Sequence, residues 1–128
     1  MQSASLLYQL TGKKEYLTDA QNIAKGCHNY FFMNYTPENT NALKMIKKGD
    51  VWFTAVMLRG FIELYHTDHN KTYLADFQKS LDYAWQYARD ERGLFQTDWS
   101  GTDKNEKKWL LTQAAFVEMY GRLAGINL

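Results

Sequence analysis

The chain contains five helix-length segments of two kinds: one segment of the first kind is apolar on nearly every side, and both segments of the second kind are apolar on one side only. The first kind covers about 2–10, 51–65 and 109–123, and its middle member reads "VWFTAVMLRGFIELY". Helices with this composition are buried on most sides. The second kind covers about 14–33 and 71–89 and carries Asp, Gln, Asn and Lys on its other face. The pattern predicts an all-α protein in which amphipathic outer helices cover buried inner helices.

The apolar face of each amphipathic segment follows helical spacing. It comprises Tyr16, Ala20, Ile23, Cys27 and Tyr30 or Phe31 in the first segment, and Tyr73, Phe77, Leu81, Trp85 and Ala88 in the second. These faces are predicted to point toward the inner helices. Arg59 interrupts the apolar segment 51–65, and it is expected either to pair with an acid, Glu63 being nearest, or to point into a cavity.

The chain contains an internal repeat. "LYQLTGKKEYLTDAQ", beginning at Leu7, aligns without a gap with "LYHTDHNKTYLADFQ", beginning at Leu64, so the offset is 64 − 7 = 57 residues. A third copy starts near Glu118-Met119-Tyr120, which resembles Glu63-Leu64-Tyr65. Repeats of this length are typical of arrays or toroids of two-helix units. The chain is therefore expected to hold about two and a half helical hairpins.

The links between helices alternate in length. Inner-to-outer links are short, and Gly12 and Asn70 suit a helix end and a helix start. Outer-to-inner links are long, about 34–50 and 90–108. In a regular array all long links lie on one face, where function is usually found. Asp50 is expected to cap the helix that begins at Val51, and Asp103 with Glu106 to form a capping box before Trp109.

Composition limits the class of protein. The 128 residues suit one domain, 1–128, and 45% apolar residues allow a sizeable core. The net charge of +1 comes without a basic stripe, which argues against nucleic-acid binding. No apolar run is long enough to cross a bilayer. Cys27 is the single cysteine, and no phosphate-binding or dinucleotide-binding motif is present, so neither a metal nor a cofactor is expected.

Candidate chemistry lies in the long links. The stretch "GLFQTDWSG", 93–101, places a carboxylate beside an indole between two glycines, and "KKGDVW" brings Asp50 and Trp52 to the same face. An indole can stack on a sugar while a carboxylate accepts its hydroxyl hydrogen bonds. Asp98 and Trp99 are therefore either a sugar-binding pair or a turn whose Trp fills the core. Asp50 and Asp98 are the two carboxylates on that face, but their spacing cannot be derived from the sequence.

Taken together, "SASLLYQLTGKKEYLTDAQNIA", "GDVWFTAVMLRGFIELYHTD" and "YLADFQKSLDYAWQYARDERGLFQTDWSG" resemble the C-terminal part of glycoside hydrolase family 76, the endo-α-1,6-mannanase-like family. The resemblance implies a partial (α/α)6 toroid, an α-mannan-like oligosaccharide as partner, and a longer parent enzyme in which Met1 is internal. It also implies that the parent is secreted, periplasmic or attached to the cell surface. The family uses two adjacent aspartates in catalysis, and no Asp-Asp pair occurs here.

The resemblance therefore implies that this chain contributes part of the wall of a substrate-binding cleft and no catalytic residues. Asp50, Trp52, Phe53, Asp98 and Trp99 are the expected substrate-binding residues, and the chain alone is expected to be inactive. The alternative is a stand-alone helical-hairpin module that binds a protein on its long-link face. In either case inner helices at the open ends of a partial toroid would expose apolar flanks, so we expect self-association through helices near 2–10 and 109–123.

Overall fold

The structure is a computed structural model that describes residues 1–38 and 41–126. Within these residues the chain forms five helices and one β-hairpin. In chain order they are α1 (Gln2–Thr11), α2 (Lys14–Phe31), β1 (Phe32–Tyr35), β2 (Leu43–Ile46), α3 (Val51–Asp68), α4 (Thr72–Tyr87) and α5 (Leu110–Ala124). All five predicted helices are present, each close to its predicted bounds.

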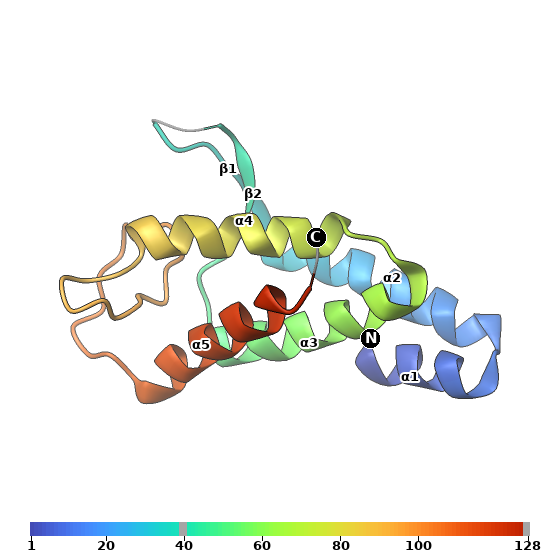
Figure 1. The fold of residues 1–128 in the computed structure, drawn as a ribbon. Coiled ribbons are helices and arrows are strands. Elements are labelled where there is room, and N and C mark those ends of the chain that lie inside the picture. The colour runs from blue at the N-terminus through green and yellow to red at the C-terminus, as the bar shows by residue number, and fades with distance from the viewer. Residues whose placement is uncertain (39–40, 127–128) are drawn as a thin grey trace.

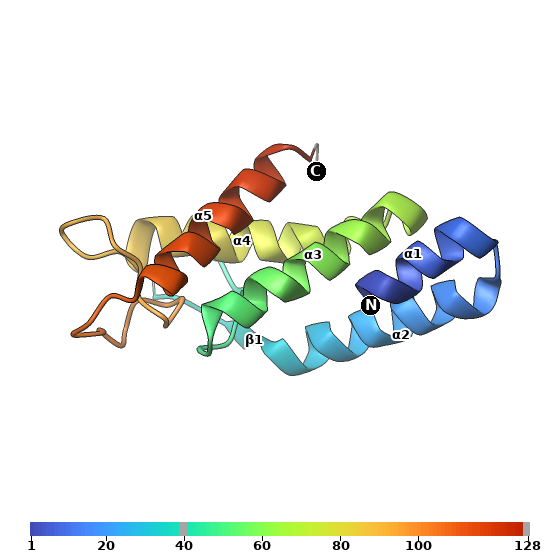
Figure 2. The same cartoon turned by 90° about the horizontal axis from the view of Figure 1, so that it is seen from below.

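The helices form two layers. Helices α1, α3 and α5 lie side by side in one layer, and α2 and α4 cover it from the other side (Figures 1 and 2). Helix α3 is central, since it packs on α1 and α5 within its layer and on α2 and α4 across the interface. The predicted double layer is confirmed. Its closure into a toroid stays a prediction.

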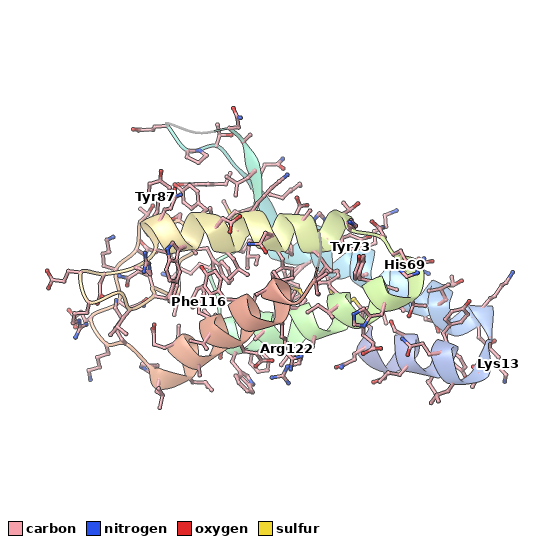
Figure 3. All side chains as sticks on the ribbon, in the orientation of Figure 1. Lys13, His69, Tyr73, Tyr87, Phe116 and Arg122 are labelled. Carbon is pink, nitrogen blue, oxygen red and sulfur yellow. The ribbon has the colours of Figure 1, made fainter. Side chains whose placement is uncertain are left out.

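Aromatic side chains fill the space between the layers. Phe61 of α3 lies 5.0 Å from Tyr73 of α4, measured between ring centroids, and Phe116 of α5 stacks on Phe95 at 4.1 Å. Figure 3 shows Tyr73 and Phe116 pointing into this space from opposite layers. Complete burial of a side chain of this size stabilises the fold by about 1.5–3 kcal/mol, so the high aromatic content serves largely as core.

Helix ends follow the predicted local chemistry in most cases. Gly12 ends α1 with φ 69°, and its N–H donates to the Tyr8 carbonyl at 2.8 Å. The Asp50 carboxylate caps α3 by accepting from the Trp52 N–H at 3.0 Å. Asn70 accepts from the Thr72 N–H at 3.0 Å as α4 begins.

The capping box predicted for Asp103 and Glu106 is wrong. Helix α5 begins at Leu110, its N-cap is Trp109, and no side chain among the described residues caps it. Asp103 instead pairs with Lys48 from the other long link, with 2.8 Å between Nζ and Oδ2. A carboxylate held in a contact between loops is not free to turn toward a helix start, so the spacing of Asp103 and Glu106 was not enough to predict a cap.

The β-hairpin was not predicted. Strands β1 and β2 pair antiparallel, with Phe32 opposite Ile46, where the sequence predicted the end of an outer helix and an irregular link. Its base is held by burial and by one hydroxyl. Phe32, Met45 and Ile46 are buried, and the Ile46 N–H donates to Ser80 Oγ of α4 at 3.3 Å. These contacts join segments that are distant in sequence, so the spacing of apolar residues along the chain could not predict the hairpin.

Two further predictions about side chains are corrected. Arg59 pairs with Glu118 of α5 rather than with Glu63, through contacts of 2.6 and 2.8 Å. On α2, Ala20 and Ala24 are buried, whereas Ile23, Tyr30 and Phe31 of the predicted inward face are 43%, 70% and 45% exposed.

The two kinds of link lie at opposite ends of the molecule, as predicted. Figure 1 shows the links α1–α2 and α3–α4 at one end, and the 88–109 loop with the start of α3 at the other. We call the second end the long-link end. No helix among the described residues is long and apolar enough to cross a membrane.

Candidate functional site

The two long links meet at the long-link end through a chain of polar contacts. Lys48, just before α3, donates to the Asp103 carboxylate at 2.8 Å. The Asp103 N–H in turn donates to the Asp98 carboxylate at 2.9 Å. Asp50 follows Lys48 by two residues. The structure thus brings Asp50 and Asp98 to one face, as the alternation of link lengths predicted.

The loop that carries Asp98 is built from two turns of the same kind. Each begins with an aspartate and closes three residues later at a glycine with positive φ. Gly93 (φ 79°) donates its N–H to the Asp90 carbonyl at 2.9 Å, and Gly101 (φ 72°) donates to the Asp98 carbonyl at 3.0 Å. Residues in left-handed conformation are rarely anything but glycine. The bracketing glycines therefore give the loop a fixed shape.

The Asp98 carboxylate is committed to this shape. Its oxygens accept from the Ser100 N–H at 3.1 Å, the Ser100 hydroxyl at 2.7 Å and the Asp103 N–H at 2.9 Å. Burial alone would raise the pKa of Asp98. The hydrogen bonds and the Lys48 ammonium outweigh burial, so this pKa lies below its ordinary value. Asp98 is therefore ionised at neutral pH and acts as a structural acceptor.

Trp99 occupies the core rather than the surface. Its side chain is 0% exposed and lies 4.8 Å from the Phe116 ring, measured between centroids. Its indole N–H has no acceptor among the described residues. A ring without exposed surface cannot stack on a sugar in this conformation. Of the two interpretations of the Asp98–Trp99 pair, the structure shows the turn with a core-filling Trp.

A polar network that the sequence did not reveal stiffens the same loop. The amide of Gln96, which is 1% exposed, accepts from the Asn105 N–H at 2.7 Å, while the Asn105 side chain accepts from the Thr97 N–H at 2.7 Å. Lys108 donates to Gln96 and, at 2.8 Å, to the Asn105 carbonyl. The signal available in the sequence was only a polar residue, Gln96, directly after the aromatic Phe95.

A cavity of about 310 Å³ opens between the two links. Asp50 lines it from the start of α3, Thr97 and Asn105 from the loop, and Thr112 from α5. Trp109 also lines it, and 70% of the Trp109 side chain is exposed. An exposed indole beside hydroxyl, amide and carboxylate groups can hold a small polyhydroxylated ligand.

The other two predicted residues lie on α3. Trp52 is half-buried beneath the Arg59 guanidinium, whose carbon lies 5.4 Å from the centre of its ring. Phe53 is 69% exposed and, with Asp50, lines a larger groove along α2 and α3.

Arg59 also affects the ionisation of Glu118 on α5. Hydrogen bonds from Arg59 and Arg122 lower the pKa of the Glu118 carboxyl to about 2, against an opposing effect of burial.

Metal binding has no support in the described part of the chain. No group of three or more His, Cys, Asp or Glu residues within 1–38 and 41–126 could hold an ion. His28 is paired with Asp76 of α4, with 2.8 Å between Nε2 and Oδ2. This contact links the two outer helices.

The fold and the long-link end together describe a double-layered helical segment with a small cavity at one end. Solved structures contain a similar fold. The chain matches a family 76 glycoside hydrolase from a bovine Bacteroides thetaiotaomicron strain with 40% identity and a TM-score of 0.92, over 96% of this chain and 27% of that one. It matches a family 76 glycoside hydrolase (mannosidase) of the same species with 38% identity and a TM-score of 0.89, over 96% and 34%.

The chain therefore matches family 76 glycoside hydrolases along almost its whole length, and the resemblance predicted from its sequence is confirmed. It spans about a quarter to a third of the length of these structures. No protein-family model and no curated protein sequence matches it.

Proposed function

We propose that the long-link end forms part of the wall of a carbohydrate-binding cleft in a glycoside hydrolase that acts on an α-mannan-like polysaccharide. The observation that carries the proposal is the cavity between the two long links, where exposed Trp109 stands beside Asp50, Thr97 and Asn105. The similarity to family 76 enzymes, one of them described as a mannosidase, supports the substrate class.

The five residues expected to bind substrate divide into two roles under this proposal. Asp50, at the cavity, and Phe53, on the adjoining groove, contact sugar directly. Trp52, Asp98 and Trp99 hold the wall in shape, because Trp52 lies beneath Arg59, Asp98 is bonded within its loop, and Trp99 is buried. Trp109 is added as the ring that stacks on a sugar face.

The proposed cleft wall supplies binding without acid–base catalysis. A glycosidase acid must hold its proton near neutral pH, which requires a raised pKa. The pKa of Asp98 is lowered, and the Asp50 carboxylate is engaged with the Trp52 N–H. We therefore propose that the 128-residue chain does not hydrolyse mannan by itself. Release of reducing sugar from α-1,6-mannan by the purified chain would contradict this part.

The binding proposal is tested by titrating the chain with an α-1,6-mannose oligosaccharide and recording amide and indole NMR shifts. We expect shifts at Trp109, Thr97 and Asn105, and their loss in Trp109→Ala. Trp85→Ala is the matched control, because Trp85 is an indole on α4 that is 50% exposed and does not itself line the cavity. Equal binding by the two variants, or no shift in the unaltered chain, would overturn the proposal.

The alternative is a helical module that binds a protein partner. The observation that favours it is the groove along α2 and α3, which reaches Asp50 and carries exposed Phe53. Under this alternative, Phe53→Ala would abolish partner binding in a pull-down, whereas the oligosaccharide would leave the NMR spectrum unchanged.

A further inference from the structure

The cavity between the two long links has an uneven distribution of charge. Asp50 lines it from the first link, and Lys107 and Lys108 line it from the second. These side chains carry a formal charge of 2 − 1 = +1. A ligand in the cavity therefore meets two cations on one side and one carboxylate on the other.

The Lys108 ammonium is held in place by neutral groups. It is half-buried, and it donates to the Gln96 side-chain oxygen and, at 2.8 Å, to the Asn105 carbonyl. An ammonium has three N–H donors, so one of them remains for a ligand. A partly buried cation that no carboxylate neutralises is stabilised when an anion binds beside it.

Lys107 adds a second cation without a partner. Its side chain is exposed, and it forms no hydrogen bond or ion pair within 1–38 and 41–126. Lys48, on the other link, differs because its ammonium is paired with Asp103 at 2.8 Å. The positive charge at the cavity thus comes from lysines that no described carboxylate neutralises.

The neutral groups of the cavity suit a sugar ring. The Asn105 side-chain oxygen accepts from the Thr97 N–H at 2.7 Å, which leaves the amide nitrogen of Asn105 free to donate. The Thr112 hydroxyl, on the first turn of α5, has no partner among the described residues. Trp109 contributes an exposed indole face. The cavity therefore combines unused hydrogen-bonding groups and an aromatic ring with unneutralised cations.

We propose that this cavity selects a sugar that carries an anionic substituent, a phosphate ester or a carboxylate, over the corresponding neutral sugar. The substituent lies against the ammonium groups of Lys107 and Lys108, while the sugar ring stacks on Trp109. Asp50 accepts from ring hydroxyls and repels the anion, so one orientation of the ligand is favoured. The inference rests on the proposed carbohydrate site and adds the charge of its ligand.

The test compares three disaccharides that differ at one carbon. They are α-1,6-mannobiose, the same sugar with a phosphate ester at C6 of its non-reducing residue, and the same sugar with that C6 oxidised to a carboxylate. NMR titration of the chain, followed at the Trp109 indole N–H, gives a Kd for each. We expect at least one anionic form to bind about fivefold tighter than the neutral form at low salt. The gain should shrink as salt is added, and the tighter anionic ligand identifies the substituent.

A pair of lysine variants shows whether the position of the charge matters. Lys107→Gln should lower the preference for the anionic form by about threefold. Lys104→Gln is the matched control, because it removes the same charge from the same loop, and Lys104 is exposed and does not line the cavity. Lys107 is more informative than Lys108, which also holds the Asn105 carbonyl. Equal effects of the two variants would overturn the proposal.

The outcomes separate this inference from the proposed function. Equal Kd values for the three disaccharides, with a shift at Trp109, would overturn the inference and leave the carbohydrate site standing. Binding of inorganic phosphate as tight as that of the phosphorylated disaccharide would show attraction of anions without recognition of the sugar, and would also overturn it. No Trp109 shift with any disaccharide would overturn both proposals.

Discussion

At the scale of single residues, the two glycines of the "GLFQTDWSG" loop have different tolerances. Both have positive φ, but a Cβ on Gly101 would lie 1.9 Å from the Tyr87 carbonyl oxygen, whereas a Cβ on Gly93 would meet nothing within 4 Å. Gly93 is thus constrained by its conformation alone, and Gly101 is constrained also by close packing on the end of α4.

We predict that Gly101→Ala lowers the free energy of unfolding by more than about 3 kcal/mol, because backbone must move to admit the methyl group. Gly93→Ala, the matched control, should cost about 1 kcal/mol for left-handed strain. Urea denaturation followed by tryptophan fluorescence measures both. Similar losses for the two variants would show that the close approach of Gly101 to α4 is unimportant.

A second residue-scale prediction concerns the ion pair between α3 and α5. Glu118→Gln should lower the free energy of unfolding at pH 7 by about 1–3 kcal/mol, because Arg59 keeps only a neutral partner. Glu63→Gln is the control at the equivalent position of α3. Glu63 accepts from the neutral Gln9 amide at 2.9 Å, so we expect a loss below about 1 kcal/mol.

The same pair gives a pH dependence with a defined sign. The pKa of Glu118 is about 2 in the fold, against an ordinary value of 4.5. A depressed pKa contributes stability above the unfolded value and loses it as pH falls toward the folded value. The stability difference between the unaltered chain and Glu118→Gln should therefore shrink between about pH 5 and pH 2. Urea midpoints measured at several pH values check this, and a constant difference would contradict it.

At the scale of elements, sequence pattern predicted what depends on local chemistry. The five helices and the Asp50 cap follow from apolar spacing and cap residues, and the common face of the long links follows from their alternation in length. The pairing of Arg59 with Glu118 and the burial of Trp99 depend on contacts between segments distant in sequence. The network around Gln96 likewise needs the loop to close. For these features the sequence identified residues that could take part but did not show which residues they would contact.

The β-hairpin is an element held by such distant contacts. The Ser80 hydroxyl of α4 accepts from the Ile46 N–H and lies 3.1 Å from the Lys44 carbonyl oxygen. The hairpin stands out from the outer layer beside α4 (Figure 1). One serine thus joins the base of the hairpin to the layer beneath it.

We predict that Ser80→Ala loosens the hairpin more than it destabilises the core. It leaves the buried Ile46 N–H without an acceptor, at a cost of about 1–3 kcal/mol. Amide exchange at Ile46 and Met45 should therefore accelerate more than exchange in α3. Ser5→Ala is a suitable control, because Ser5 is also buried but its hydroxyl donates to the carbonyl of Met1, a neighbour in the same helical turn, at 3.3 Å. Uniform acceleration across the chain would contradict a local role for Ser80.

At the scale of the whole molecule, the inner layer ends in two unlike flanks. On α5 an exposed stripe follows helical spacing and consists of Leu110, Ala114, Val117, Gly121 and Ala124. On α1, Ser3, Leu6 and Leu10 are exposed, and Leu10 is 83% exposed. Within the layer, α1 meets α3 through Gln9 and Glu63, and α3 meets α5 through Arg59 and Glu118. The same kind of contact is thus repeated from one inner helix to the next.

This repetition gives the expected self-association a direction. The α5 stripe of one copy should pack against the α1 flank of another, continuing the layer head to tail. An interface between unlike surfaces does not stop at a dimer unless the ring closes. Small residues at Ala114 and Gly121 allow close approach of the two helices, and burial of Val117 and Leu10 supplies the driving force.

We predict that the chain associates with rising concentration into species larger than a dimer, as measured by sedimentation velocity. Val117→Lys should keep it monomeric, because a lysine in the centre of the stripe would be buried without a partner. Ile23→Glu, which alters an exposed apolar residue outside both flanks, should associate like the unaltered chain. A monomer at every concentration up to about 1 mM, where interactions of about 4 kcal/mol are detected, would contradict the prediction. Association that Val117→Lys leaves unchanged would place the contact elsewhere on the molecule.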